Sequence, residues 1–398
     1  MKALAIVPGT RTVRLVERPE PTVSAPDEIK LRVLGVGICG TDREEAAGGR
    51  ADAPPGRDDL VLGHEMIGEV VEVGEAVKRV RPGDLAVFTV RRGCGRCLPC
   101  AMNRSDMCLT GGFRERGIRG LDGFQAEYVV DREQYVVAVP REIASIAVLT
   151  EPLSVVEKAI DEAVRLQFAR LPGAGATPDW LYGRRCLVAG LGPIGLLAAM
   201  ALTLRGAEVH GLDVVDAGTA RPAWLERIGG TYVDGRRVPA EDISAELGPM
   251  EFVFEATGAP RLAFNLLEAL SDNGVYVLTG IPTAHCVARL DACDLVRHLV
   301  LNNQAMIGSV NAARGHFQMA VDDLVQASHR WNGHVDRLIT HRFAPAEAAA
   351  ALHRHPTDEI KAVIEWGDAA PVDRGTDSAN PHSESPPTPT DRHGSHRT

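Results

Sequence analysis

Residues 186–195 read CLVAGLGPIG, and this stretch decides the fold. The apolar run 186–189 is typical of a buried parallel strand, and a helix is expected over residues 193–205. Between strand and helix stands a G-x-G-x-x-G pattern formed by Gly190, Leu191, Gly192, Pro193, Ile194 and Gly195. The glycines allow a tight turn against a pyrophosphate, to which the start of the helix offers free N–H groups. The pattern therefore predicts a dinucleotide-binding site.

The end of the next expected strand, residues 208–212, bears on which dinucleotide is bound. Asp213 follows that strand and lies 21 residues after Gly192. A carboxylate there can accept hydrogen bonds from the adenosine ribose and would repel a 2′-phosphate. Val214 and Val215 come next and offer no arginine to a phosphate. NAD is therefore favoured, and NADP stays the alternative because Arg221 could turn toward the site.

The strand–helix alternation extends well beyond the glycine pattern. Further strands are expected over residues 251–256, 275–278 and 306–310. Repeated strand–helix units of this kind predict a doubly wound parallel sheet, an α/β fold, over residues 185–310.

The flanking parts of the chain have a different character. Residues 1 to about 150 contain short strands, at 29–36, 66–73 and 85–90, broken by Gly and Pro, with a Gly-rich turn over 37–40. This predicts a small β-barrel or β-sandwich. Helices are expected over residues 151–164 and 317–326 and a last strand over 362–366, the later two rejoining the first domain.

Composition bounds the function and the setting. The 398 residues suggest two domains, and the net charge of −10 argues against nucleic-acid binding. No stretch approaches the length of apolar chain that spans a membrane, and no signal peptide is recognisable, so we expect a cytoplasmic protein. Residues 367–398 are rich in Pro, Ser, Thr, Asp and His, and we expect this tail to be disordered.

Four cysteines are spaced as C-x2-C-x2-C-x7-C, in a lobe spanning residues 93–109: Cys94, Cys97, Cys100 and Cys108. Four thiolates close a tetrahedral shell around zinc and leave no open position for substrate. This lobe therefore predicts a structural zinc site, with an iron–sulfur cluster as the weaker alternative. Chemistry must take place elsewhere.

A second group of metal-ligand types stands in the barrel region. Cys39 precedes His64 by 25 residues, and Glu65 follows directly. A catalytic zinc needs about three protein ligands and one open position, which this set could supply. The spacing alone is equally compatible with a buried cysteine and a structural histidine.

Together these motifs resemble the zinc-containing medium-chain dehydrogenase/reductase family. The matching stretches, in the family's order, are residues 37–42 (GICGTD), residues 63–65 (GHE), the four-cysteine lobe, residues 123–128 (GFQAEY) and the glycine pattern. The match covers residues 1–366. It implies a GroES-like β-barrel catalytic domain, made of residues 1–184 and 311–366, around a Rossmann domain of residues 185–310.

Within that family the chain is most similar to the glucose 1-dehydrogenase branch. Residues 111–118 (GGFRERGI), 149–158 (LTEPLSVVEK) and 308–311 (GSVN) carry this similarity. The branch implies a catalytic zinc at Cys39, His64 and Glu65, with Glu151 at a fourth ligand position. It implies a sugar site formed by Thr41, Glu115, Glu151 and Asn311. It implies cofactor contacts at Leu191, Gly192, Pro193, Ile194, Thr279, Gly280, Ile281, Ser309, Val310 and Asn311.

The implied reaction is oxidation of the C1 hydroxyl of glucose or a similar aldose to the lactone, with zinc as Lewis acid, hydride transfer to NAD(P) and Thr41 passing on the hydroxyl proton. Some members of the branch carry an aspartate where this chain has Val155, and Glu157 could supply the missing sugar contact. We expect two zinc ions per chain and a homodimer or homotetramer.

Three other functions compete with this one. A dehydrogenase of another polyol, a cyclitol or a secondary alcohol would use the same chemistry. A zinc-free quinone reductase or a non-catalytic dinucleotide-binding protein would lack the set of Cys39, His64 and Glu65, which is present here.

Overall fold

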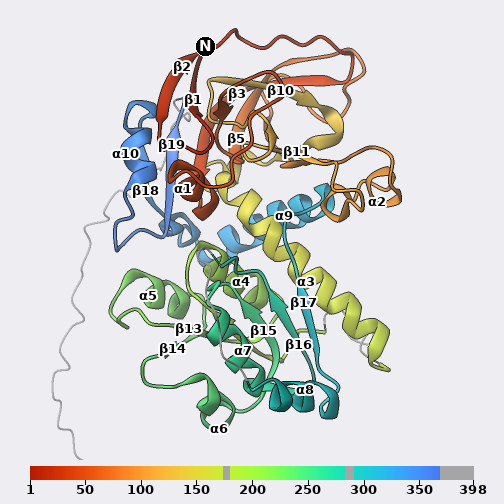
Figure 1. Cartoon of the computed structure of the whole chain (residues 1–398), viewed down its shortest axis with the longest axis vertical. Coiled ribbons are helices and arrows are strands. Elements are labelled where there is room, and N and C mark those ends of the chain that lie inside the picture. The colour runs from red at the N-terminus through yellow and green to blue at the C-terminus, as the bar shows by residue number, and fades with distance from the viewer. Residues whose placement is uncertain (174–179, 283–290, 368–398) are drawn as a thin grey trace, which may run out of the picture.

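The structure is a computed structural model that describes residues 1–173, 180–282 and 291–367. The expected disordered tail, apart from Gly367, lies outside the described residues. Among the helices that the structure describes, none has the length and hydropathy needed to cross a membrane. Figure 1 shows two units stacked along the long axis, with the N-terminal strands in the upper one.

The lower unit is built on a six-stranded sheet in which every neighbouring pair is parallel. Its spatial order is β14 (Thr231–Asp234), β13 (Glu208–Asp213), β12 (Arg185–Ala189), β15 (Met250–Glu255), β16 (Leu270–Leu278) and β17 (Ala305–Gly308). Its helices are α4 (Pro193–Leu204), α5 (Ala220–Arg227), α6 (Ile243–Leu247), α7 (Pro260–Asn265) and α8 (Ala292–Leu301). The strand order reverses between β12 and β15, which places a ligand crevice beyond the carboxyl ends of the strands.

The glycine pattern forms the predicted turn between β12 and α4. Gly190 has a φ of 88°, which an L side chain rarely adopts. A Cβ on Gly195 would lie 1.7 Å from the carbonyl oxygen of Gly190, so only glycine lets the helix begin this close to the strand. The turn therefore brings backbone, rather than side chains, to the crevice.

The upper unit is antiparallel for the most part. Its largest sheet has the order β11 (Val136–Val139), β6 (Leu85–Phe88), β5 (Glu65–Val73), β3 (Glu28–Ile38), β19 (Lys361–Glu365) and β18 (Ile339–Phe343), and β10 (Tyr128–Arg132) also pairs with β3. Smaller sheets are formed by β2 (Val13–Glu17), β1 (Lys2–Ile6) and β4 (Leu60–Val61), and by β7 (Arg91–Arg92), β8 (Arg114–Arg116) and β9 (Gly120–Leu121). The remaining helices are α1 (Gly40–Ala46), α2 (Leu98–Ala101), α3 (Thr150–Arg170), α9 (Arg314–Trp331) and α10 (Ala348–His353).

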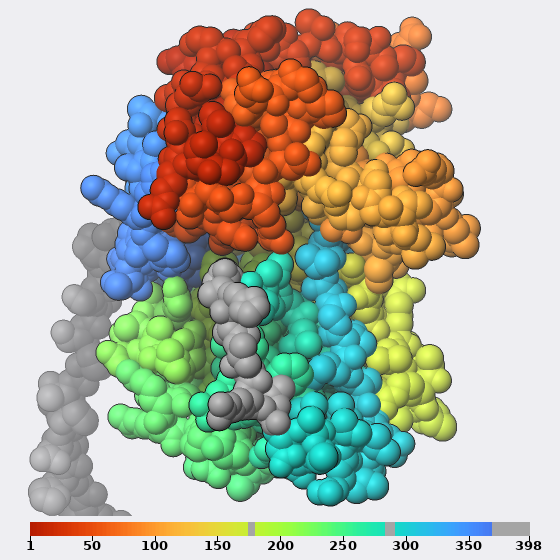
Figure 2. All heavy atoms as spheres, viewed as in Figure 1, coloured from red at the N-terminus to blue at the C-terminus, as the bar shows by residue number. Residues whose placement is uncertain are grey.

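The last strand rejoins the first part of the chain, as expected. β19 pairs antiparallel with β3, in a register that places Ala362 opposite Ile38. The pairing buries Ala362, Val363 and Ile364 in the core. Both ends of the described chain thus build one unit, with the parallel sheet inserted between them (Figures 1 and 2).

Three local predictions need correction. The Gly-rich turn predicted over residues 37–40 is wrong, because β3 continues to Ile38 and α1 begins at Gly40. Helix α3 extends six residues beyond the predicted end at 164, because its buried face continues to Gln167. Helix α9 is longer at both ends than predicted, since it packs along α3.

Candidate active site

Three donor groups converge where β3 ends and β5 begins. The ligand atoms of Cys39, His64 and Glu65 all lie within 4.8 Å of one another. The Cys39 Sγ lies 3.1 Å from His64 Nε2, so the two donors point at the same space. His64 and Glu65 are buried, at 5% and 1% exposure. The structure therefore brings together three of the four residues predicted to hold a catalytic zinc.

Helix α1 positions Cys39. Cys39 is its N-cap residue, and the Thr41 backbone N–H donates to the Cys39 Sγ at 3.2 Å. The Asp42 Oδ2 in turn accepts from the Cys39 N–H at 2.9 Å, which completes a capping box. The hydroxyl-bearing residue Thr41 thus stands in the turn directly beside the donor set.

Asp42 was missed by the sequence reasoning. Its Oδ1 lies 3.5 Å from His64 Nδ1, on the side of the ring opposite to Cys39, and its side chain is 2% exposed. A carboxylate behind a ligating histidine fixes the ring's orientation and tautomer and raises its basicity. The signal that could have found it is the spacing of Cys39 and Asp42, which matches a capping box at a helix start.

Glu65 is held by the other end of the chain. The Lys361 Nζ forms an ion pair with Glu65 Oε2, and both side chains are almost completely buried. A Cβ on Gly37 would lie 2.0 Å from Glu65 Oε2, so glycine at this position of β3 leaves the room that the carboxylate occupies. Without the return of β19, the buried Glu65 would lack this countercharge.

Burial and neighbouring charges shift the pKa values of Cys39, His64 and Glu151. Burial raises the pKa of the Cys39 thiol. Burial alone would lower the pKa of His64, but Cys39 and Asp42 hold it well above its ordinary value. Burial and the Glu65 charge raise the pKa of Glu151 to about 7, against the opposite pull of His64 and Lys361. Perturbed groups gathered in this way are typical of functional sites.

Glu151 stands in the first turn of α3 and interacts electrostatically with His64 and Glu65. It is not among the three donors whose ligand atoms lie within 4.8 Å of one another. Its place as a fourth ligand stays a prediction. Its position beside the donors suits a residue that borders the substrate.

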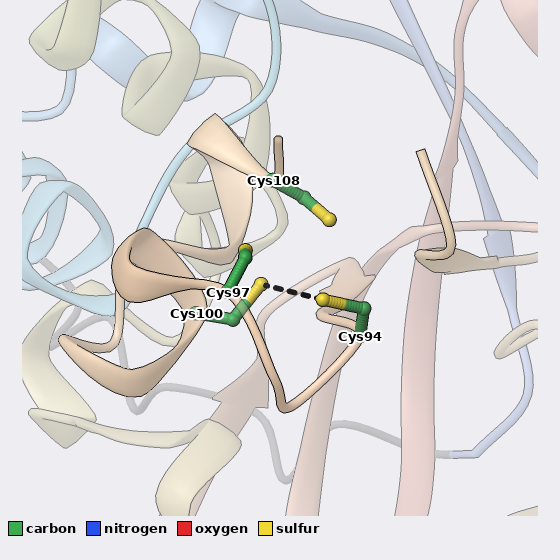
Figure 3. A group of neighbouring side chains, drawn as sticks. All are labelled: Cys94, Cys97, Cys100 and Cys108. Atoms are coloured by element: carbon green, nitrogen blue, oxygen red, sulfur yellow. Dashed lines mark hydrogen bonds between the residues drawn. The ribbon is translucent and has the colours of Figure 1, made fainter. Parts of the chain in front are cut away.

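The second donor cluster is the four-cysteine lobe. The Sγ atoms of Cys94, Cys97, Cys100 and Cys108 also lie within 4.8 Å of one another, and Figure 3 shows them facing a common centre. Hydrogen bonding from Thr110 lowers the pKa of Cys94 to about 5 and that of Cys108 to about 7. These two thiols favour the thiolate form that binds metal, whereas burial raises the pKa of Cys100 to about 12.

The two clusters fit zinc on the chemistry of their donors. A shell of four sulfur atoms leaves no position open, which suits a structural ion. A thiolate, an imidazole and a carboxylate leave a position for substrate, which suits a catalytic ion. The Asp42 carboxylate behind His64 is the outer contact that such a site requires.

The residues predicted to bind the dinucleotide lie at the carboxyl end of the parallel sheet. Asp213 ends β13, and its Oδ2 accepts from the Leu191 N–H at 2.7 Å, which joins it to the glycine turn. Arg221 instead donates to the Glu359 carbonyl oxygen at 3.0 Å. Arg236, just after β14, is an arginine near this edge that was not predicted from the sequence. It donates to Asp216 Oδ1 at 2.7 Å and forms a second ion pair with Asp234.

Exposed apolar side chains mark the same edge. Val214, Ile281 and Val310 are 63%, 49% and 51% exposed, and each follows a strand of the parallel sheet. Thr279 and Gly280 are held there by N–H groups that donate to the Glu255 carbonyl oxygen. Apolar groups exposed beside a glycine turn suit the faces of a bound dinucleotide.

Two of the predicted sugar residues, Glu115 and Asn311, contact each other although they lie 196 residues apart in the chain. The Asn311 Nδ2, three residues beyond β17, donates to Glu115 Oε1 on β8 at 2.8 Å. Ser309, two residues before Asn311 in the cofactor segment, is buried, and its N–H donates to the Leu278 carbonyl oxygen.

The suggestion that Glu157 replaces a lost sugar contact is wrong. Its side chain is fully buried, and its Oε2 accepts from Arg205 Nη2 at 2.6 Å in the packing between α3 and α4. Val155 stands two positions earlier on the same helix. The Glu157 carboxylate is therefore paired with Arg205, and its burial keeps it out of reach of a sugar.

Comparison with known proteins identifies the family. The family described as "Glucose dehydrogenase C-terminus" matches residues 144–366, and the "Alcohol dehydrogenase GroES-like domain" matches residues 25–141. The chain is 36% identical over 371 residues to a glucose 1-dehydrogenase of Methanocella arvoryzae, covering 92% of this chain and 100% of that protein. It is 39% identical over 368 residues to a glucose 1-dehydrogenase of Thermoproteus tenax, covering 92% and 99%.

A solved structure agrees with both units. The structure of Haloferax mediterranei glucose dehydrogenase in complex with NADP, Zn and gluconolactone is 34% identical in sequence, with a TM-score of 0.82. The match covers 92% of this chain and 99% of that chain. The expected GroES-like and Rossmann architecture is thereby confirmed. The chain belongs to the glucose dehydrogenase family of the zinc-containing medium-chain dehydrogenases.

Proposed function

We propose that this chain is a glucose 1-dehydrogenase, which oxidises the C1 hydroxyl of D-glucose or a similar aldose to the lactone with NAD or NADP. The convergence of Cys39, His64 and Glu65 is the observation that carries the proposal. A quinone reductase or a non-catalytic binding protein has no use for such a set. The relatives described as glucose 1-dehydrogenases cover almost the whole chain and support the sugar assignment.

The residues have distinct roles in this mechanism. When bound, zinc supplies Lewis-acid polarisation of the sugar hydroxyl, and the dinucleotide accepts the hydride from C1. Asp42 keeps His64 oriented, and Lys361 balances the charge of Glu65. Thr41 Oγ1 takes the hydroxyl proton and passes it toward solvent. Glu115, Glu151 and Asn311 orient the sugar ring, and the lactone forms without a protein nucleophile.

A substrate panel tests this function. The wild-type chain is assayed with glucose, other aldoses, polyols, cyclitols and simple secondary alcohols, each with NAD and with NADP. Glucose or a close aldose should give the highest kcat/KM. Activity confined to simple alcohols or cyclitols would overturn the sugar assignment while leaving the zinc chemistry intact.

Asp213 should set the preference for NAD. Replacing Asp213 by alanine removes a charged acceptor for the ribose, so kcat/KM with NAD should fall about tenfold to a hundredfold, with a smaller loss for NADP. The Leu191 N–H also loses its acceptor. Initial rates with both cofactors measure the change, and Asp272→Ala, which removes an exposed acid from β16, is the matched control. An unchanged NAD/NADP ratio would contradict the role of Asp213.

We also propose that the chain assembles as a homodimer or homotetramer in the cytoplasm. Strand β17 is the last strand of its sheet, and α8 beside it exposes Val296, Val300 and Leu301 at 56%, 68% and 71%. An exposed apolar face near the outermost of the described strands of a sheet suits a subunit contact. Light scattering of the purified protein decides this, and a monomer at micromolar concentration would contradict it.

A further inference from the structure

Lys158 is a buried cation in the middle of α3 that the proposed mechanism leaves without a role. Its side chain is 2% exposed, and its Nζ donates to the Val310 carbonyl oxygen at 2.8 Å. The same Nζ lies 3.3 Å from Asp106 Oδ2, whose side chain is fully buried. Asp106 belongs to the four-cysteine lobe, between Cys100 and Cys108. One ammonium group therefore holds the lobe against the segment that follows β17.

A second path of contacts joins the same two places. The Arg91 Nη1 donates to the Asp106 carbonyl oxygen at 2.8 Å, and Arg91 Nη2 lies 2.9 Å from Glu115 Oε1. That Glu115 oxygen also accepts from Asn311 Nδ2 at 2.8 Å. Because Asn311 follows Val310 directly, the two paths close into a ring. The ring starts and ends at Asp106. It contains Glu115 and Asn311, two of the residues predicted to bind the sugar.

We propose that Lys158 is a positioning residue, which clamps the four-cysteine lobe to Val310 and so places Asn311 and the cofactor segment for binding. This rests on the proposed function, since it takes residues 309–311 to contact the cofactor and the sugar. Lys158 touches neither of them. It acts through the Val310 carbonyl group and through the lobe.

The backbone of the segment explains why the contact between Lys158 and Val310 affects Asn311. Asn311 has a φ of 63°, a left-handed conformation that the surrounding contacts must hold in place. A second α3 residue, Glu162, accepts from Ser309 Oγ at 3.3 Å, so α3 contacts two consecutive residues of the segment. If Lys158 is lost, the Val310 carbonyl group loses its buried donor, and the Asp106 carboxylate keeps Arg104 of the same lobe as a partner but loses its direct link to α3 and Val310. The structural lobe thereby contributes to binding at a site that it does not line.

Lys158→Met and Asp106→Asn, singly and combined, test the proposal in the zinc-loaded full chain. We expect Lys158→Met to raise the NADH dissociation constant, measured by NADH fluorescence, and the KM for sugar by about tenfold each. The kcat should change much less, because no group that touches the reacting atoms is altered. Asp106→Asn keeps the Val310 contact and should show a smaller effect in the same direction. The double variant should be no worse than Lys158→Met, since both changes break one ring.

Arg165→Met removes an exposed cation from the same helix and should leave all constants unchanged. Zinc content of two ions per chain and an unchanged melting temperature would show that Lys158→Met is folded. If it does not fold, Asp106→Asn carries the test. Wild-type binding constants in both variants, or a loss confined to kcat, would overturn the role of Lys158. An inactive wild-type enzyme would refute the proposed function instead, and the NADH titration would still report on the clamp.

Discussion

Replacing Cys39 by serine is expected to lower kcat by about a thousandfold or more, because the substitution removes the thiolate that completes the donor set. Cys39, His64 and Glu65 supply one ligand atom each, and Cys39 is the only sulfur among them. A serine hydroxyl is a far weaker zinc ligand at neutral pH than a thiolate. The zinc content should fall from about two ions per chain to about one, with the lobe cysteines keeping theirs.

NADH binding should survive in the same variant. The glycine turn and Asp213 belong to the parallel sheet and share no hydrogen bond with Cys39 among the described residues. Stopped assays with glucose, fluorescence titration with NADH and metal analysis separate the three effects. Cys293→Ser is the matched control, since Cys293 is exposed on α8. Retained turnover in a Cys39→Ser protein with one zinc would refute the catalytic assignment.

Most of the features predicted correctly from sequence have a local physical cause; the return of the last strand to the first domain is an exception. The G-x-G-x-x-G turn is readable because the close approach of Gly195 to the Gly190 carbonyl group excludes every other residue within a single turn. The four cysteines are readable because they span fifteen positions and can close one shell. The strand–helix alternation predicted the parallel sheet for the same reason, since each unit carries its own hydrophobic period.

The features missed depend on contacts between distant parts of the chain. Lys361 neutralises Glu65 only because β19 returns beside β3, and no pattern around either residue indicates the partner. Asp42 contacts His64 over a much shorter stretch of chain, but the two residues lie on different elements, α1 and the start of β5, and the sequence does not show that these meet. The rotation of α3 about its axis, which turns Glu157 toward α4 and away from the sugar, is set by the packing of α4 and α9 on it. A residue's type can be read from the sequence, but the direction in which a buried helix presents it cannot.

Arg205 forms buried ion pairs away from the active site, and its loss should destabilise the fold. It is the C-cap residue of α4. Its Nη2 lies 2.6 Å from Glu157 Oε2 on α3, and its Nη1 lies 2.7 Å from Asp323 Oδ2 on α9. The side chains of Glu157, Asp323 and Arg205 are 0%, 12% and 16% exposed. One guanidinium therefore joins three helices. Burial and the neighbouring Asp323 carboxylate raise the pKa of Glu157 well above its ordinary value, against the opposite pull of Arg205.

Arg205→Met should lower the free energy of unfolding by about 3 to 5 kcal/mol, because it leaves two buried acids facing each other without a cation. Urea denaturation of the zinc-loaded enzyme, followed by circular dichroism, measures the shift in midpoint. Arg330→Met on α9 is the matched control: Arg330 is exposed and donates to the Thr203 carbonyl oxygen at 3.2 Å, so its loss should cost at most about 1 kcal/mol.

A compensated variant separates charge from packing. In Arg205→Met/Glu157→Met/Asp323→Leu the three helices meet through apolar groups, and most of the lost stability should return, because well-packed apolar side chains replace buried ion networks with little cost. If the triple variant is as unstable as Arg205→Met, the helices depend on the shape of the arginine and not on its charge. If Arg205→Met alone costs less than about 1 kcal/mol, the network contributes no more than a surface ion pair. Recovery in the triple variant would show that the buried charge of Glu157 serves the joint between α3, α4 and α9, and that it is dispensable once its partners are removed with it.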